Sequence, residues 1–315
     1  MKTNIRFSQN LKKYLCVSAA VILIGIVCNI IFGTHLDIQF SGGTIVNYTF
    51  TGNVEETELK DYIQNITEQT VTTNVSENLI AGDTSDKQSY VVAVQFSGDT
   101  VISPEQQQDI TTKLQEKYKD NDFELRDSTS VEASMGLKFF LKCLVAIAIA
   151  AVIMVLYVAF RFRNIGGLSA GCMALVALAQ DIVVIYFTFV ILRLPIDSNF
   201  MAVILMIIGY SLNDTIVIYD RVRENRRLMD RNTPVAELYN TSANQMFKRT
   251  IFTSFTTVMA IGAVLVISII FGLDSVRNFA LPMMLGVIYG CYSSNCIAGP
   301  LWVAWQNRKA AKAAK

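Results

Sequence analysis

The chain has 315 residues, of which 52% are hydrophobic and only 17% charged, and its mean hydropathy is +0.39. Soluble domains carry about 25% charged residues, so this composition argues against an ordinary water-soluble enzyme. A single histidine, His35, excludes a histidine-built zinc site and a Ser-His-Asp triad within an apolar core, and we expect no metal site.

The net charge of +1 conceals two regions of opposite charge. Residues 34–134 contain 18 acidic and 6 basic residues, a net charge of −12 (6 − 18). The rest of the chain holds 8 acidic (26 − 18) and 21 basic residues (27 − 6), a net charge of +13. All six cysteines lie in apolar segments outside the acidic region, so we expect no disulfide framework there.

Apolar segments of the length that crosses a membrane occur six times. A hydrocarbon core of ~30 Å requires about 20 largely apolar residues in a helix. We interpret the first segment as an uncleaved anchor, because no small-x-small cleavage site follows it. The predicted spans are residues 15–32, 139–160, 165–192, 200–219, 251–271 and 279–305.

The acidic region predicts a compact α+β domain. Asn53 with Glu56, and Ser103 with Gln106, are spaced to cap two helices, and Pro104 occupies the first position of the second helix. The resulting order β-α-β-β-α-β is that of a ferredoxin-like sandwich, whose two helices cover one face of the sheet. In chain order we predict a strand at 39–51, a helix at 54–68, strands at 70–76 and 89–97, a helix from 103, and a strand at 123–131.

Basic residues lie mostly on one side of the predicted membrane. They follow the second, fourth and sixth spans, whereas the opposite connections carry only Arg193 and Arg277 beside Asp197 and Asp274. Because basic short loops stay in the cytoplasm, we expect both termini there. The predicted parts are 1–33 (N-terminus and first span), 34–134 (extracytoplasmic domain), 135–305 (five further spans, with a cytoplasmic loop at 220–248) and 306–315 (basic cytoplasmic tail).

Two acidic residues lie well inside predicted spans. An ionised side chain there costs about 2.5–3.5 kcal/mol, so Asp181 and Asp214 should each face a partner or water. At ~1.5 Å per residue, Asp181 lies ~16 Å from Leu192 and Asp214 ~21 Å from Phe200, which puts both acids at a similar depth in antiparallel helices. Two interpretations stay open: a titrating group, or a hydrogen bond that fixes helix packing.

Small residues recur at four-residue spacing in two spans. Gly167 and Gly171 lie in the third, and Gly286 and Gly290 in the sixth. This spacing predicts close helix approach, either within the chain or against a partner.

A run from residue 209 to 225 resembles the signature of the SecF members of the SecD/SecF family, within the resistance-nodulation-division superfamily. Six spans with an outer domain after the first resemble that family over nearly the whole chain, and residues 249–254 are also similar to it. Residues 40–44, with Gly42 and Gly43, resemble its Asp-Phe-x-Gly-Gly element, although Gln39 precedes the phenylalanine. The signature residues are Gly209, Tyr210, Ser211, Asn213, Asp214, Asp220, Arg221, Arg223, Glu224 and Asn225.

The resemblance implies an auxiliary subunit of the Sec export machinery in the bacterial inner membrane. Such a subunit uses the proton motive force with SecD, late in the translocation of an unfolded polypeptide. The implied partners are SecD and the SecYEG channel, with YajC and YidC as further candidates, and no nucleic acid. No cofactor is implied beyond the proton gradient, and sodium in place of protons stays open.

The resemblance also implies roles for four residues. Asp214 and Arg249 match an acid and an arginine implicated in proton conduction, and Asp181 with Asn213 would complete their polar network. Gln180 stands where the family often has a histidine, and it cannot titrate. Along its helix Arg249 lies ~12 Å nearer the cytoplasm than Asp214, so an interfacial arginine is the alternative interpretation.

Two other functions remain to be compared. A superfamily exporter of small molecules or lipids would need an apolar pocket in or below the outer domain, and a net charge of −12 argues against one. A purely structural scaffold would use the buried acids for packing alone. The chain contains no Gly-x-x-x-x-Gly-Lys-Ser/Thr motif, so we expect no ATP hydrolysis. As a subunit of a translocation machinery, the chain is not expected to be an enzyme.

Overall fold

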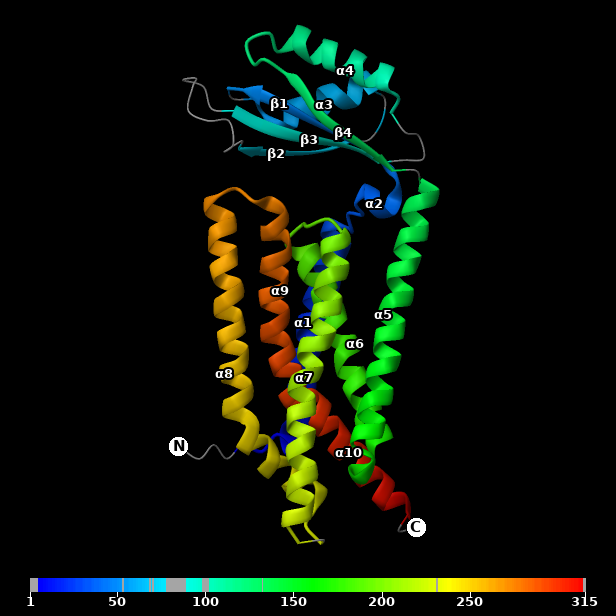
Figure 1. The fold of residues 1–315 in the computed structure, drawn as a ribbon, viewed down its shortest axis with the longest axis vertical. Helices are drawn as coiled ribbons and strands as arrows, with labels where there is room; N and C mark the ends of the chain where they lie inside the picture. Colours follow the sequence, from blue (N-terminus) through cyan, green and yellow to red (C-terminus); the bar gives the residue numbers. More distant parts are fainter. Residues whose placement is uncertain are drawn as a thin grey trace.

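The computed structural model describes residues 5–52, 54–67, 69, 71–77, 89–97, 102–131, 133–230 and 232–313. A small sheet domain lies above a long helical bundle, and the short helix α2 (Ile38–Ser41) lies between them (Figure 1). Both chain ends lie at the end of the bundle opposite the sheet (Figure 1).

Five helices among the described residues are long and apolar enough to cross a membrane. They confirm five of the six expected spans. The sixth, 279–305, is not confirmed as one uninterrupted helix, because it divides into α9 (Asp274–Ser293), the π-helical turn η3 (Ser294–Ala298) and α10 (Gly299–Ala313). The five are α1 (Leu11–Phe32), α5 (Ala133–Arg161), α6 (Gly167–Ile191), α7 (Ser198–Leu228) and α8 (Val235–Ile270).

The expected loop at 220–248 is mostly helical. α7 continues to Leu228 and α8 begins at Val235. This stretch contains three buried apolar side chains: Val222, Leu238 and Tyr239. Their burial stabilises the helical extensions beyond the predicted spans, because packing of an apolar face contributes most of the stability of a helix.

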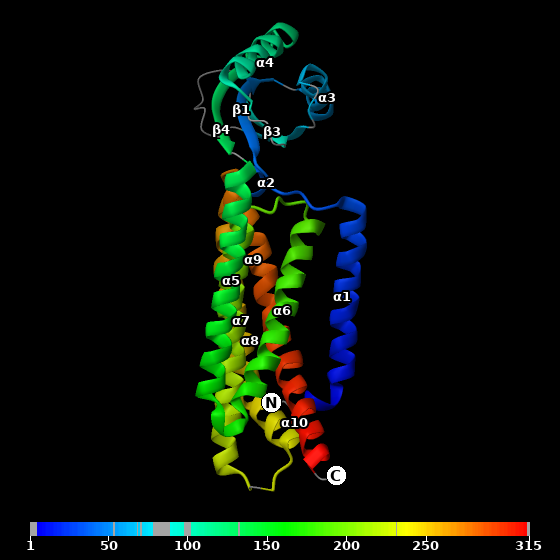
Figure 2. The ribbon, with the colours of Figure 1, turned by 90° about the vertical axis from the view of Figure 1, so that its right-hand side faces the viewer.

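Two helices form the centre of the bundle. In their most apolar windows, 50% of the residues of α6 and 56% of those of α7 are buried, against 11% in α1, 6% in α5 and 11% in α8. α1 stands to one side, next to α6 (Figure 2). The outer helices therefore expose broad apolar surfaces, as helices that face lipid or a partner do.

The glycine pairs pack within the chain. A Cβ atom at Gly167 would lie 2.2 Å from the carbonyl oxygen of Ala159 in α5, and one at Gly286 would lie 2.8 Å from Ile207 in α7. The backbones of α5 and α6 thus approach as closely as small residues permit.

The outer domain is a four-stranded antiparallel sheet in the order β2-β3-β1-β4. Alternate residues of β1 (Gly43–Thr51), including Tyr48, are buried against apolar residues of α3 (Glu56–Thr67) and α4 (Pro104–Lys117), which cover one face. The predicted strand at 89–97 is confirmed as β3 (Ser89–Ser97). The other strands are β2 (Val71–Glu77) and β4 (Glu124–Val131).

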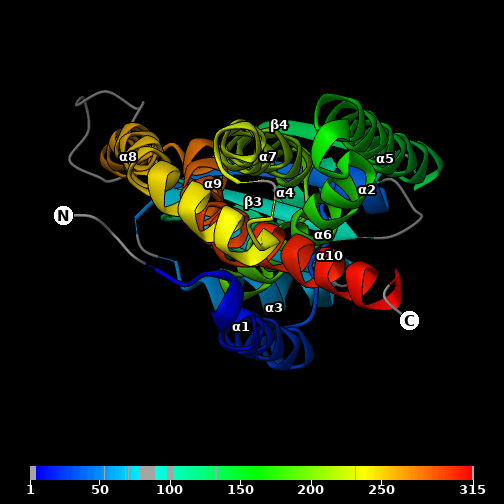
Figure 3. The ribbon, with the colours of Figure 1, turned by 90° about the horizontal axis from the view of Figure 1, so that it is seen from below.

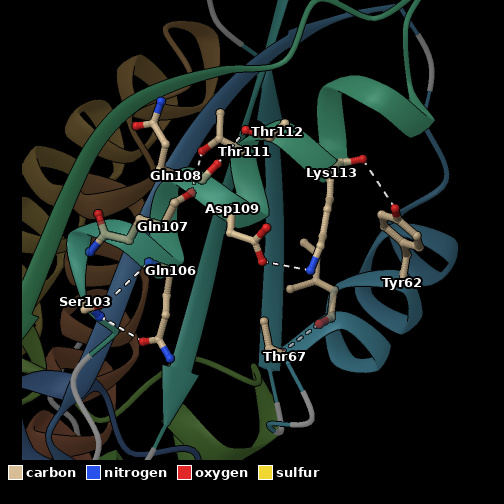
Figure 4. A network of polar contacts seen from close by, with 11 residues as sticks. Tyr62, Thr67, Ser103, Gln106, Gln107, Gln108, Asp109, Thr111, Thr112 and Lys113 are labelled. Carbon is tan, nitrogen blue, oxygen red and sulfur yellow. Dashed lines mark hydrogen bonds and ion pairs between the residues drawn. The ribbon is translucent and has the colours of Figure 1, made fainter.

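The predicted cap of α4 is confirmed (Figure 4). The Gln106 N–H donates to Ser103 Oγ over 3.3 Å, and the Ser103 N–H donates to Gln106 Oε1 over 3.0 Å. The Tyr62 hydroxyl of α3 donates to the carbonyl oxygen of Lys113 over 3.3 Å and so links the two helices. Asn53, the expected cap of α3, lies outside the described residues, and Glu56 accepts a hydrogen bond from Thr73 of β2 instead (3.2 Å).

The first strand begins later than expected. Residues 39–41, predicted as strand, belong to α2, because Asp37 Oδ1 accepts the Gln39 N–H over 2.9 Å and caps a helical turn. Gly42 ends this turn at φ +80°, and Gly43 follows at φ +132°. A Cβ atom at Gly43 would lie 2.2 Å from the Phe96 carbonyl oxygen, so the glycine pair provides both the turn and the close approach to β3.

Candidate functional site

A hydrogen bond joins the two central helices in the interior of the bundle. The Ser211 hydroxyl of α7 donates to Oδ2 of Asp181 in α6 over 2.6 Å. The two side chains are 2% and 1% exposed. Oδ1 of Asp181 has no hydrogen-bond partner among the described residues. One oxygen of this buried carboxyl group therefore accepts no hydrogen bond, although the Ser293 side chain also faces the group.

The π-helical turn brings a third element to the same place. The Ser294 hydroxyl of η3 donates to the Ser211 carbonyl oxygen over 2.8 Å, and its Oγ lies 3.3 Å from Ser211 Oγ. π-helical turns interrupt the regular helical spacing and occur frequently at functional sites. Here the turn directs a buried hydroxyl at the serine that holds Asp181.

Asp214 lies one helical turn after Ser211 and is 2% exposed. Its Oδ2 atom has no hydrogen-bond partner among the residues that the structure describes. Ser254 of α8 faces this carboxyl group and accepts a hydrogen bond from the Tyr210 hydroxyl over 3.1 Å. α8 thus supplies the polar surroundings of Asp214.

A further cluster fastens α8 to the π-helical turn. The Tyr239 hydroxyl donates to the Asn295 carbonyl oxygen over 2.9 Å, and the Asn295 amide donates to the Cys291 carbonyl oxygen over 2.8 Å. The Thr250 hydroxyl lies 3.5 Å from Asn295 Oδ1. α6, α7, α8 and η3 are therefore linked by polar side chains in the core of the bundle.

Two residues expected in this network lie outside it. Asn213 and Arg249 have exposed side chains, and no ion pair joins Arg249 to Asp214 in the described part of the chain. Thr250, the neighbour of Arg249, is the residue that reaches the core. The Arg249 side chain therefore does not reach across the depth difference between Arg249 and Asp214 that the sequence predicts.

Gln180, which precedes Asp181, begins a separate chain of contacts. Its amide donates to the Tyr289 hydroxyl of α9, which donates to the Ser18 hydroxyl of α1 over 3.2 Å. α1 is thereby connected to the residue beside the buried acid.

The charged end of the signature run ties α7 to its neighbours. Asp220 lies 3.3 Å from Arg161 of α5 and 2.7 Å from Arg223, and the Asn225 amide donates to Ser242 of α8 over 2.8 Å. Arg221 pairs with Glu224 over 2.6 Å. Gly209 has open space around it, so packing within the chain does not require a glycine there.

Sequence reasoning did not assign Tyr239, Ser294 and Asn295 to the site. Part of this cluster has a sequence signal, because an otherwise apolar segment contains three consecutive polar residues: Ser293, Ser294 and Asn295. Their placement depends on the π-helical turn, which no local pattern predicted.

The chemistry of the network suits a group that gains and loses a proton. A hydroxyl can donate to a carboxylate and accept from a protonated carboxyl group, so serines beside Asp181 and Asp214 accommodate both forms. Among the described residues no group of three or more His, Cys, Asp or Glu side chains could hold a metal ion.

A second pair of acids lies where the segment after α1 meets the α6–α7 connection. The Asp37 N–H donates to the Ile196 carbonyl oxygen over 3.1 Å, and the Ile196 N–H donates to the His35 carbonyl oxygen over 2.8 Å. Burial raises the pKa of Asp37, although the Gln39 N–H lowers it, and the charge of Asp197 adds to the rise. Burial also raises the pKa of Asp197, which caps α7.

Residues 110–308 match the family described as "Protein export membrane protein SecD/SecF, C-terminal". The chain belongs to the SecD/SecF family. It is 30% identical over 325 residues to the protein translocase subunit SecF of Alicyclobacillus acidocaldarius, covering 100% of this chain and 97% of that protein. It is 28% identical to SecF of Petrotoga mobilis, covering 97% of each. A chain of this family with these helices is a multi-pass membrane protein.

A solved structure agrees with the fold. The crystal structure of SecDF from Thermus thermophilus, described as a translocon-associated membrane protein, matches with a TM-score of 0.76 at 27% identity. The match covers 97% of this chain and 39% of that chain, so the chain corresponds to about two fifths of SecDF.

Proposed function

We propose that this chain uses the proton motive force, together with SecD, to assist the late translocation of secreted proteins. The observation that carries the proposal is the pair of buried carboxyl groups, Asp181 and Asp214, each with an oxygen that has no partner among the described residues. Packing alone does not require such groups, because burying a polar atom without a partner costs about 1–3 kcal/mol.

The mechanism begins at Asp214. Protonation removes a charge from the interior and changes which packing of α7 against α8 and η3 is favoured. The start of α7 is fixed to the segment after α1 through the hydrogen bonds between Ile196 and residues 35 and 37. A shift of α7 therefore reaches the chain that leads into the outer domain.

α2 provides the connection to the sheet. Phe40 stacks on Phe139 of α5 with ring centroids 5.6 Å apart and meets Phe140 edge-on at 5.3 Å. Gly136 lies so close that a Cβ atom there would meet the Phe40 backbone at 3.0 Å. With β1 following α2 and β4 preceding α5, motion between α5 and α7 would tilt the outer domain.

Several finer features of the architecture belong to the same proposal. α9 with η3 and the start of α10 forms the sixth span, and the strand order β2-β3-β1-β4 supports a ferredoxin-like outer domain. The charge distribution supports cytoplasmic termini and an outer domain outside the inner membrane of a bacterium. The parts are then 1–33, 34–134, 135–305 and 306–315, as the sequence predicts.

The relatives support two of the expected partners. SecDF continues beyond the 39% that this chain matches, which supports SecD as a separate partner covering the exposed faces of the outer helices. The description of SecDF as translocon-associated supports contact with the SecYEG channel. YajC, YidC and the unfolded client polypeptide stay expectations from the resemblance.

The test replaces Asp214 by Asn, which keeps size and hydrogen bonding but cannot titrate. Release of a secreted protein is measured in membrane vesicles with an imposed proton gradient, normalised to assembled complex. We expect Asp214→Asn to lose the stimulation by the gradient and Asp214→Glu to retain part of it. Asp230→Asn, exposed just after α7 and in no ion pair in the described part of the chain, is the matched control and should keep the stimulation. Unchanged gradient dependence in Asp214→Asn would refute the proton role.

A further inference from the structure

A cavity of about 730 Å³ lies at the end of the bundle opposite the sheet domain. It is formed where the 159–173 segment meets α7, α8 and α10, and α10 crosses this end of the bundle (Figure 3). Its volume lies within the ~300–1,000 Å³ range of small-ligand sites. None of its lining residues belongs to the network around Asp181 and Asp214.

The charged residues that line this cavity are all basic. Arg163, Arg226 and Lys309 line it, and no Asp or Glu is among the lining residues. No carboxylate pairs with any of the three in the described part of the chain. Arg226 donates one hydrogen bond, to the Thr233 carbonyl oxygen over 3.4 Å. The neighbouring Arg221 and Arg223 are instead paired with acids.

Two further features favour an anion with oxygen acceptors. The first turn of α6 lines the cavity, and the start of a helix carries a partial positive charge. The Trp302 side chain, which also lines the cavity, is 2% exposed, and its indole N–H has no acceptor among the described residues. A phosphate oxygen is an acceptor of the kind that this buried donor lacks.

The other side of the cavity is apolar and faces outward. Leu168 is 70% exposed, Trp305 is 50% exposed, and both line the cavity. Tryptophans are enriched where a membrane protein crosses the headgroup level, and exposed leucines on a spanning helix face acyl chains. The cavity thus offers cations inside and a lipid-facing apolar rim outside.

We infer that this cavity binds the phosphate-bearing headgroup of an anionic phospholipid. The three cations and the start of α6 hold the phosphodiester, while the acyl chains run along Leu168 and Trp305. Basic pockets between membrane helices bind anionic headgroups by this chemistry. A bound lipid would contact α6, α7, α8 and α10 together and so stabilise their arrangement at this end of the bundle.

The first experiment measures lipid binding to the full-length, delipidated protein by native mass spectrometry. Dioleoyl phosphatidylglycerol and dioleoyl phosphatidylcholine are added separately, in the same detergent. We expect the wild-type protein to bind phosphatidylglycerol about tenfold more tightly or better. Arg163→Gln/Arg226→Gln/Lys309→Gln should reduce that preference to less than about threefold, since these three cations line the cavity and would hold the headgroup. The matched control, Arg227→Gln/Arg308→Gln/Lys312→Gln, removes the same charge from residues outside the cavity and should keep the preference.

A second experiment needs no charge variant. Cys172 is exposed and lines the cavity, whereas Cys16 is exposed on α1 and does not. Phosphatidylglycerol should slow maleimide labelling of Cys172 at least about threefold relative to Cys16, and phosphatidylcholine should not. Inorganic phosphate that protected Cys172 as fully as phosphatidylglycerol would overturn the assignment to a lipid. Equal binding of the two lipids by the wild-type protein, or equal loss of preference in both triple variants, would overturn the site itself.

Discussion

The Ser211 hydroxyl donates to Oδ2 of Asp181 over 2.6 Å and joins α7 to α6 in the interior of the bundle. The carbonyl oxygen of the same serine accepts the hydroxyl of Ser294 from η3 over 2.8 Å. One residue therefore connects a buried acid to the π-helical turn that interrupts the last apolar segment. These hydrogen bonds connect α6, α7 and η3 through one serine.

The close approach of α5 and α6 depends on the absence of a side chain at Gly167. In Gly167→Ala the new Cβ atom would lie 2.2 Å from the Ala159 carbonyl oxygen. This oxygen belongs to the helix backbone, so it cannot move aside by a side-chain rotation. We expect the free energy of unfolding to fall by about 1–3 kcal/mol. Gly262→Ala in α8 is the control, since nothing lies within 4 Å of its Cβ position, and alanine is the better helix former. Thermal unfolding in detergent checks the pair; similar melting temperatures for both variants would contradict the packing described.

The Asp37–Asp197 junction should strengthen as the pH falls. Burial raises the pKa of both carboxyl groups, so the folded junction binds protons more readily than the unfolded chain does. Its stabilisation is therefore greatest with both groups protonated and is lost as the pH rises through the raised pKa values. Hydrogen-exchange protection factors of the Asp37 and Ile196 amides, corrected for intrinsic exchange, measure this. Asp197→Asn keeps a good helix cap and removes the charge, so protection should depend less on pH. Protection of these amides that decreased on acidification would contradict the prediction.

The sheet domain has an apolar core of its own. Tyr48 and Phe50 of β1 are buried with Leu59 of α3 and Leu114 of α4, separately from the core of the bundle. Phe40 belongs to the bundle core instead, so residues 34–42 should add little to the stability of the domain. A fragment of residues 43–131 should therefore fold as a monomer, insensitive to reducing agent, with a melting temperature close to that of a 34–134 fragment.

Circular dichroism and thermal melts of both fragments test this directly. Val46→Asp places a charge at a position that is 0% exposed and should unfold the domain, whereas Thr129→Asp, on the exposed strand β4, should not. A shorter fragment that was random coil while the longer one folded would mean that residues 34–42 belong to the domain.

Local patterns predicted the elements whose signals are complete within a few residues. The capping box of Ser103 and Gln106 and the alternation of 89–97 are of this kind, and both were confirmed. The prediction of a strand at residues 39–41 was wrong, because these residues belong to the helical turn α2. Its cap at Asp37 is held by a hydrogen bond to Ile196, a residue distant in the sequence, and contacts of that kind have no local signature.

The polar network shows the same division. Counting residues along the helices predicted that Asp181 and Asp214 lie at a similar depth in the membrane. Both are buried in the structure, and Ser211, which bonds to Asp181, is buried with them. A resemblance marks positions in a run but not the face of the helix on which each lies, so Asn213 and Arg249 were expected beside the acids and have exposed side chains. The π-helical turn that brings in Ser294 and Asn295 joins α9 to α10, and both of these helices contact α7 and α8, which lie far from them in the sequence.

The contact between Asp181 and Ser211 should produce a measurable coupling, and its neighbour on the same helix should not. Asn213 follows Ser211 by two residues, which in a helix of 3.6 residues per turn places it on the opposite face. We expect the double-mutant cycle of Asp181→Asn with Ser211→Ala to give an interaction energy of about 0.5–3 kcal/mol, because the two side chains share a buried hydrogen bond. The cycle of Asp181→Asn with Asn213→Ala should be additive within ~0.5 kcal/mol, because Asn213 is exposed and shares no partner with Asp181 in the described residues.

Both cycles are measured as free energies of unfolding of the purified protein in mixed micelles titrated with a denaturing detergent. Each single variant must first give one cooperative transition, because the cycle is defined only for a two-state change. Equal interaction energies in the two cycles would mean that replacing Asp181 shifts the backbone of α7, so that the coupling does not depend on the Ser211 hydroxyl. Coupling confined to Ser211 would identify this hydroxyl as the direct link. Because Asn in place of Asp181 can still accept the hydrogen bond, the coupling measures the part of that bond that depends on the carboxyl group.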